Sequence, residues 1–188
     1  AGQAAVAIQM AERQAELVHR EKVLQVLHKI DRSILSAPLE TTLDIVLRGS
    51  LELIGASFGN LLLIDADDKN QLVIKATTTR DEEMKLKEFQ ARLLIRSSIS
   101  GIPIESGEGM IIADVEKHEL YVPLLRDGQK PMRSELVVPL KANGEMIGVL
   151  NIESPKVGAF SESDMELLVI LAGQAAVAIQ MAERQAEL

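Results

Sequence analysis

Two apolar runs separated by an Asn-Gly dipeptide form the clearest pattern in the sequence, between Arg133 and Ser154. Asn143 and Gly144 both tolerate positive φ angles, which a tight type I′ turn requires. The flanking runs are rich in Val, Ile and Leu and alternate little with polar residues, which is typical of strands covered on both faces. The pattern predicts a β-hairpin at the centre of a sheet, which helices from elsewhere in the chain must cover.

The first 36 residues are predicted to form one long helix, because they contain no Pro, one Gly near the start and many good helix formers. Such a helix would be about 50 Å long at about 1.5 Å per residue, so part of it must project from a domain of this size. Two segments have coiled-coil spacing: Ala4, Ile8, Ala11, Ala15 and Val18, then Val23, Leu27, Ile30 and Ile34. The segments are out of phase, so near residues 19–22 the helix changes either its buried face or its partner.

This spacing predicts a homodimer in which the N-terminal helices of two chains run parallel. We expect four residues to lack sufficient partners within one domain: Ile8, Leu27, Ile30 and Ile34. Burying side chains of this kind is worth about 1.5 to 3 kcal/mol each. The alternative is a single amphipathic helix that packs on its own domain.

Shorter patterns divide the rest of the chain into helices and strands. In chain order they predict a helix over residues 39–54 with a stop at Gly55, strands near 58–65 and 72–78, a helix over 80–96, a short strand near 110–113 and a final helix from 161 onward. The irregular segment 98–131 is where we expect a pocket, because long irregular segments over a sheet often build binding sites. The acidic turn 65–68 lacks the Gly and the distant Glu of a calcium loop, so we expect no metal site there.

Composition narrows the possible chemistry. The 188 residues are 47% hydrophobic and 26% charged, as in one soluble globular domain. The absence of Cys excludes thiol nucleophiles, thiolate metal sites and cofactors attached through sulfur. A net charge of −8 and 2% aromatic residues argue against nucleic-acid binding. We interpret the sequence as having no apolar run of membrane-spanning length and no secretion signal. We therefore expect a cytoplasmic protein without membrane partner, cofactor or metal.

Residues 1–17 are identical to residues 172–188. Because chance cannot give a 17-residue identity, either the chain is one period of a tandem array plus an overlap, or the end of the last helix has been copied onto the front. We divide the chain into a helix over 1–36, a domain over 37–182 and a C-terminal helix extension over 172–188. Head-to-tail assembly through the duplicated ends is one consequence, since such contacts need not close.

Four motifs occur in the order and spacing of one known family. They are ISGIPIESGEGMIIADV at 99–115, RSELVVPL at 133–140, IGVLNIES at 147–154 and FSESDMELLVILAGQAAVAIQMA at 160–182. Over residues 38–182 the chain resembles a GAF domain, a small-molecule-binding and signalling module of sensor proteins. The resemblance implies an α/β fold, more narrowly α+β, with about six antiparallel strands, terminal helices on one face and a ligand pocket on the other. Such domains commonly dimerise through parallel terminal helices.

The resemblance also implies a set of candidate ligand-binding residues around the pocket. They are Phe58, Leu62, Asp114, Tyr121, Ser134 and Glu135. Several also have a structural interpretation: Phe58 as a core residue, Asp114 as a helix N-cap and Tyr121 as a boundary residue with its hydroxyl in water.

The function implied is a non-catalytic regulatory module that binds an unidentified small molecule or none, and relays changes through its terminal helices. Members that bind cyclic nucleotides carry an Asn-Lys pair, then a Phe, then Asp-Glu. Phe160 and Asp164 match, but Met165 replaces the Glu, while Ser154 and Pro155 replace the Asn-Lys pair. Cyclic-nucleotide binding is one alternative, and a self-assembling array built through the duplicated helices is another.

Cofactor and enzyme hypotheses have less support. Family members that attach a bilin, and GAF-like enzymes that reduce free methionine sulfoxide, use cysteines, which this chain lacks. Haem would need His19, His28 or His118 as an axial ligand, and all three are interpreted as surface positions. No hydrolase motif or phosphate-binding glycine loop is present, so we expect no enzymatic activity.

Overall fold

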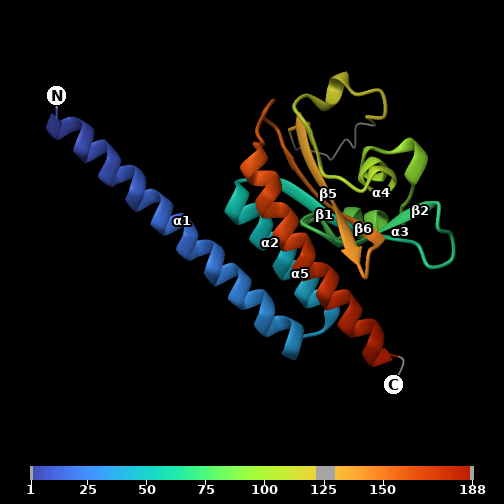
Figure 1. The fold of residues 1–188 in the computed structure, drawn as a ribbon. Helices are drawn as coiled ribbons and strands as arrows, with labels where there is room; N and C mark the ends of the chain where they lie inside the picture. The colour runs from blue at the N-terminus through green and yellow to red at the C-terminus, as the bar shows by residue number, and fades with distance from the viewer. Residues whose placement is uncertain (1, 122–129, 187–188) are drawn as a thin grey trace.

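The computed structural model describes residues 2–121 and 130–186 as an α+β fold in which a curled sheet lies against a layer of helices (Figure 1). A long N-terminal helix extends well beyond both layers. The helices are α1 (Gly2–Ser36), α2 (Leu39–Ile54), α3 (Glu82–Gln90), α4 (Ile102–Ser106) and α5 (Glu162–Ala186), with short 3-10 turns at Ile95–Ser97, Ile99–Gly101 and Val115–Lys117. The strands are β1 (Phe58–Ile64), β2 (Gln71–Thr77), β3 (Arg92–Leu94), β4 (Met110–Ile112), β5 (Ser134–Ala142) and β6 (Glu145–Ser154).

The six strands form one antiparallel sheet in the order β3-β2-β1-β6-β5-β4. The predicted hairpin is confirmed as β5 and β6, and its turn residues Asn143 and Gly144 have φ angles of 52° and 81°. β6 pairs with β1 in the middle of the sheet, while β5 lies one strand from the edge. The hairpin therefore supplies one central strand rather than the whole centre.

The main core lies between this sheet and helices α1, α2 and α5. Side chains of Leu61, Leu136 and Leu150 from the sheet pack with Leu47 of α2 and Leu168 of α5, and all five are fully buried. Gly55 ends α2 as predicted, in the left-handed region with φ 80°. A capping box begins α5, with Ser161 and Asp164 bonded to each other's backbone N–H groups.

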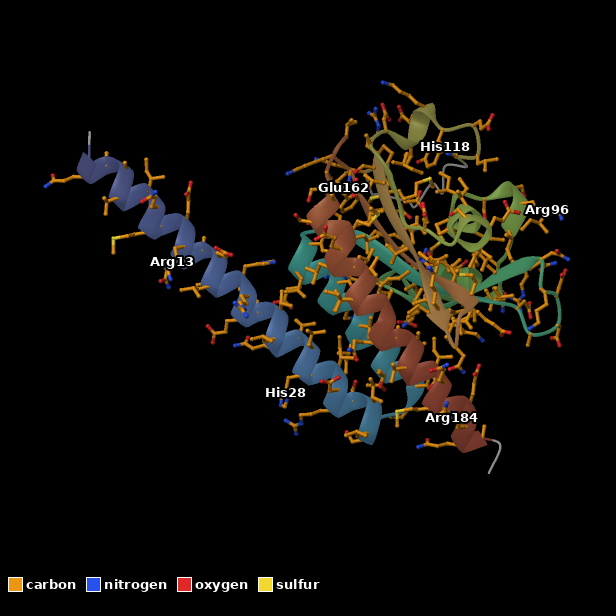
Figure 2. The ribbon with its side chains drawn as sticks, in the orientation of Figure 1. Arg13, His28, Arg96, His118, Glu162 and Arg184 are labelled. Atoms are coloured by element: carbon orange, nitrogen blue, oxygen red, sulfur yellow. The ribbon has the colours of Figure 1, made fainter. Side chains whose placement is uncertain are left out.

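Helix α1 has two parts with different surroundings. Every residue from 2 to 22 is exposed, and Arg13 lies on the part that projects from the domain (Figure 2). The second part packs on α2 and α5, and Val26 lies so close to Gly49 of α2 that a Cβ there would approach its Cγ1 to 2.6 Å. The projecting helix predicted from its length is thus confirmed.

The burial of α1 corrects one premise of the dimer prediction. Ile30 is completely buried in the main core, and Leu27 and Ile34 are partly buried against it. These three residues find their partners within the chain, whereas Ile8 remains 59% exposed. The parallel homodimer stays a prediction, but Leu27 and Ile34 cannot test it, because replacing them would also disturb the fold.

The helix predicted over residues 80–96 is wrong in its second half. α3 ends at Gln90, Ala91 adopts an extended conformation with ψ 146°, and Arg92 pairs with Val73 as the edge strand β3 begins. Leu93 packs in a second apolar cluster on the other face of the sheet, together with Phe89 of α3. Pairing with β2 therefore overrides a helical spacing of apolar residues, as tertiary contacts often do.

Helix α5 also corrects an expectation, because it is long and apolar enough by composition to cross a membrane. In the fold, however, Leu168, Leu171, Ala175 and Ile179 are buried on one side of the helix. α5 packs against α2 and β5. This is the position of a core helix, and core helices of soluble proteins are often as long and as apolar as a membrane-spanning helix.

Candidate functional site

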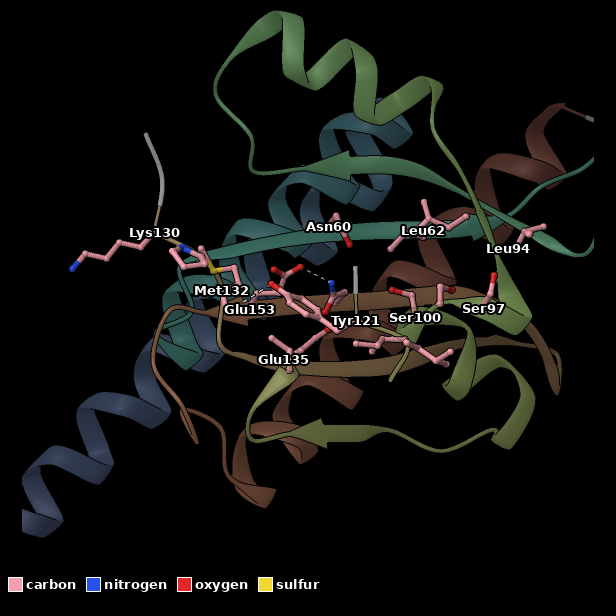
Figure 3. A pocket seen from close by; sticks show the side chains of 17 residues that line it. Asn60, Leu62, Leu94, Ser97, Ser100, Tyr121, Lys130, Met132, Glu135 and Glu153 are labelled. Carbon is pink, nitrogen blue, oxygen red and sulfur yellow. Dashed lines mark hydrogen bonds between the residues drawn. The ribbon is translucent and has the colours of Figure 1, made fainter. Parts of the chain in front are cut away.

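A cavity of about 350 Å³ lies on the face of the sheet opposite α2 and α5 (Figure 3). Its floor is formed by β1, β6 and β5, and its walls come from residues 93–100, 115–121 and 130–132. The irregular segment that the sequence marked as a pocket region thus contributes to it, although residues 122–129 lie outside the described part of the chain.

Four polar side chains lie together on the floor. Asn60 of β1 pairs across the sheet with Asn151 of β6, and Glu135 of β5 pairs with Glu153 of β6. Asn151 and Glu153 are two residues apart, so strand alternation points both to the same face. Side chains of cross-strand partners lie about 4.5 to 5.5 Å apart at Cβ. Three neighbouring strands therefore present one continuous polar patch.

This patch is buried and rich in hydrogen-bond acceptors. Asn60, Asn151 and Glu135 are only 6%, 3% and 6% exposed. The amide nitrogen of Asn151 donates a hydrogen bond of 3.1 Å to Oε1 of Glu153. Among the described residues, the side-chain oxygens of Asn60 and Asn151 are buried without a hydrogen-bond partner. Since buried polar atoms are rarely left unpaired, these oxygens are candidate contacts for a water or another bound molecule.

The electrostatics of the floor follow from its acidic pair. Burial, and then the neighbouring charge of Glu153, raise the pKa of Glu135 well above its ordinary value. Burial, followed by the charges of Glu153, Glu116 and Glu135, raises the pKa of Tyr121 as well. The Tyr121 hydroxyl donates a hydrogen bond of 3.4 Å to the carbonyl of Met132. The floor therefore favours a proton or another positive charge.

Glu135→Gln is expected to stabilise the protein at neutral pH and to remove part of its pH dependence. Because the folded-state pKa of Glu135 is raised, the folded state holds more protons than the unfolded state between the ordinary pKa of 4.5 and the folded value. The stabilisation by the proton is complete below that window and lost above it, whereas Gln resembles the protonated acid at every pH. Urea unfolding at pH 5 and pH 8 measures the effect, with Glu145→Gln at the exposed start of β6 as control. A variant that is less stable at neutral pH would contradict the assignment.

A family model described as the GAF domain matches residues 36–180. The chain belongs to the GAF domain family. Comparison with curated proteins gives no match. The match of the family model confirms the resemblance inferred from the four motifs.

Solved GAF domains share the fold of this one. The GAF domain of a phosphoenolpyruvate-protein phosphotransferase from Acinetobacter is 23% identical with a TM-score of 0.72, covering 86% of this chain and 94% of that one. The corresponding domain from Coxiella burnetii is 25% identical with a TM-score of 0.73, covering 89% and 98%. A free methionine-R-sulfoxide reductase from Neisseria meningitidis, in complex with its substrate, is 23% identical with a TM-score of 0.71, covering 89% and 91%. The fold therefore occurs both in domains of larger proteins and in enzymes.

The structure brings three of the six candidate residues of this GAF domain into the cavity. Leu62 lies on the floor and also belongs to the apolar cluster on this face, Tyr121 comes from a wall, and Glu135 contributes to the acidic pair. Phe58 is buried at the start of β1 and lines a neighbouring hollow with Arg80.

The other two candidate residues have structural partners outside the cavity. Asp114 pairs with Arg133 at 3.2 Å. Desolvation raises the pKa of Asp114, but the hydrogen bond and charge of Arg133 lower it, and the net shift of the pKa is downward. Asp114 precedes a 3-10 turn but makes no side-chain cap to it. Ser134 points to the face opposite Glu135, where its hydroxyl donates a bond of 2.7 Å to the carbonyl of Lys156.

Three floor residues were not predicted from the sequence: Asn60, Asn151 and Glu153. Each interrupts an otherwise apolar strand, in the runs FGNLLLI and GVLNIES. A polar residue in the middle of a strand expected to be covered on both faces needs a partner. That conflict was the available signal for a site on this face of the sheet.

The described residues contain no cluster of three or more His, Cys, Asp or Glu side chains that could hold a metal ion. In the acidic turn, Asp65 pairs with Arg92 at 2.9 Å, and Asp68 accepts bonds from Asn70 and Gln71. His28 is exposed on α1 (Figure 2), and Nδ1 of His118 accepts a bond from its own turn. The aspartates and His118 thus make contacts within or next to their own turns, and His28 lies on the surface.

Proposed function

We propose that this GAF domain is a non-catalytic regulatory module that binds a small molecule in the cavity and relays its presence through the terminal helices. The observation that carries the proposal is the buried polar floor of the cavity, with two amide oxygens that have no partner among the described residues. A volume of about 350 Å³ falls within the range of small-molecule sites. Apolar walls with a few convergent polar groups are typical of such sites.

The contents of the cavity favour binding over catalysis. The chain has no cysteine, and no described lining residue is a histidine. A carboxyl pair such as Glu135 and Glu153 can exchange protons, but covalent catalysis also needs an activated nucleophile near a base. The serines of the wall, including Ser97 and Ser100, have no such base beside them among the described lining residues.

The acidic floor also argues against a cyclic nucleotide as ligand. Two carboxyl groups, Glu135 and Glu153, face the cavity, and a phosphate beside them would raise the cost of ionising either one in a buried site. The sequence departs from the cyclic-nucleotide pattern at Met165 as well. We therefore favour a ligand without a phosphate.

The connection from the floor to the helices supports a relay. β6 carries Asn151 and Glu153 and leads within eight residues from Ser154 to the start of α5 at Glu162. The hydroxyl of Ser134 on β5 holds this connection at the carbonyl of Lys156. α5 in turn packs on α2 and on α1. We propose that a second copy of the chain receives the change through its own terminal helices, as a homodimer.

A small-molecule library screened by thermal shift tests the proposal, with Ser97→Trp as the blocking variant. Ser97 is exposed at the cavity wall (Figure 3), so a Trp there should close the entrance without disturbing the core. A ligand at 100 times its Kd adds about 2.7 kcal/mol of stability, and the variant should lose that gain. Ser36→Trp, at the exposed end of α1, is the matched control and should keep it. A library without any hit, or hits that are equal in the blocked variant, would overturn the proposal.

A further inference from the structure

We propose that the cavity takes a small organic cation, a protonated primary amine on an apolar body, whose N–H groups bind Glu135, Asn60 and Asn151. The inference rests on the proposed function and deepens it, because it names the class of ligand. Its basis is an excess of buried acceptors over donors on the floor, combined with negative charge and apolar walls.

A hydrogen bond sets the orientation of the Asn151 amide group. Because the amide nitrogen of Asn151 donates to Glu153, the amide oxygen of Asn151 must point the other way, and it has no partner among the described residues. The amide oxygen of Asn60, the cross-strand neighbour of Asn151, is also buried without a partner among the described residues. An ammonium group carries three donors and no acceptor, so it matches the two amide oxygens and the Glu135 carboxyl group of this floor.

Glu135 differs from the other buried glutamate of the described chain. Glu88 is held by the hydroxyls of Thr77 and Thr79, which donate bonds of 2.6 and 2.7 Å. The carboxyl of Glu135 receives no such bond from a described residue, although it is 6% exposed and lies beside Glu153. A buried carboxyl in that position is costly unless a donor or a cation accompanies it. The protein supplies these partners at Glu88, and a ligand would supply them at Glu135.

The surrounding walls define the rest of the ligand. Lys130, the only Lys or Arg among the described lining residues, extends away from the acidic floor (Figure 3). Leu62, Leu93, Ile99 and Leu120 supply apolar surface around the polar patch. A cavity of about 350 Å³ is far larger than a bare metal ion needs, and its apolar walls would leave most of that ion's coordination unfilled. The fit is therefore to an organic cation with an apolar body.

Three compounds of one shape and different charge test this inference on the full chain. We would measure binding of 2-phenylethylamine, 2-phenylethanol and phenylacetate by isothermal titration calorimetry at neutral pH. The amine should bind at least about tenfold more tightly than the alcohol, because hydrogen bonds to charged groups exceed neutral ones by about that factor. Phenylacetate should not bind. The amine should also release a proton on binding, since Glu135 must ionise to pair with it.

Two variants of the floor separate the effect of its charge from that of its neutral acceptors. Glu135→Gln should weaken amine binding at least about tenfold and leave the alcohol unchanged. Asn60→Leu, of similar size, should weaken the amine without changing the charge. Glu145→Gln, elsewhere on β6, should have no effect. Circular dichroism and thermal unfolding show that each variant is folded.

The outcomes distinguish this inference from the proposed function. If alcohols or other neutral compounds bind in a manner that Ser97→Trp blocks but Glu135→Gln does not, the cavity is a binding site and the amine inference is wrong. Binding of Ca²⁺ or Mg²⁺ alone, lost in Glu135→Gln, would also overturn it. If no compound binds in a manner that Ser97→Trp blocks, both the inference and the proposed function fail.

Discussion

Replacing Ile179 by Ala is expected to lower the free energy of unfolding by about 2 to 5 kcal/mol. The same substitution at Ile8 is expected to change it by less than about 0.5 kcal/mol. The two isoleucines occupy the same place in identical 17-residue sequences. Ile179 is 2% exposed in the main core, whereas Ile8 is 59% exposed on the projecting part of α1. The difference measures tertiary packing alone, because the neighbours along the chain are the same.

Urea unfolding of both variants and the parent protein, at several protein concentrations, checks this result. Helix propensity changes equally at both positions, since each is Ile→Ala within the same sequence. At low concentration the effect at Ile8 should vanish. An equal loss at both positions, independent of concentration, would mean that the N-terminal copy packs within the fold, contrary to the structure.

The duplicated segment also illustrates what sequence alone could establish. The helical spacing and the αL stop at Gly55 are local properties, as is the hairpin turn at Asn143 and Gly144, and the structure has all of them. Whether a helix is buried, in contrast, depends on contacts with segments far away in the sequence. Ala175, Ala176, Ala178 and Ile179 are buried, whereas the residues at the same places in the first copy, at 4, 5, 7 and 8, are exposed. The partners of Ile30 and the strand at Arg92 were missed for the same reason, because both depend on contacts far away in the sequence.

Only part of the site was predictable, because some of its residues belong to motifs and others come together through strand register. Family resemblance led to Leu62, Tyr121 and Glu135, which line the cavity. Asn151 and Glu153 could be recognised as odd residues in an apolar strand, but their common face and partners depend on register. The register places Glu135 opposite Glu153, and a shift of one residue would point each strand's side chains to the other face. The polar floor is therefore a property of strand pairing rather than of any motif.

Deleting residues 1–17 is expected to leave the domain folded and to abolish higher assembly. All described residues of this segment are exposed, including Val6, Ile8, Met10 and Leu17, so none contributes to the core. The melting temperature should stay close to that of the full chain. The exposed seam of Ala4, Ile8, Ala11, Ala15 and Val18 has coiled-coil spacing, which favours association with a second copy.

The second copy is the expected occupant because the same residues already pack when the fold offers them a surface. Ala175, Ala176 and Ile179 of the C-terminal copy are buried in this domain. Their counterparts at Ala4, Ala5 and Ile8 carry the same surface without a partner in the described chain. Alanine side chains allow helices to approach closely but bury little area, so each junction should be weak and dependent on concentration.

Sedimentation velocity over a range of concentrations measures the assembly of the full and truncated chains. Ile8→Glu in the full chain should reduce association as the deletion does, whereas Gln9→Glu, an exposed position beside the face of Ile8 and outside its seam, should not. Thermal unfolding of each protein reports whether the domain is intact. A truncated chain that melts far lower, or that forms the same large species, would show that residues 1–17 belong to the fold, and the interpretation of the duplicated segment as an assembly surface would be wrong.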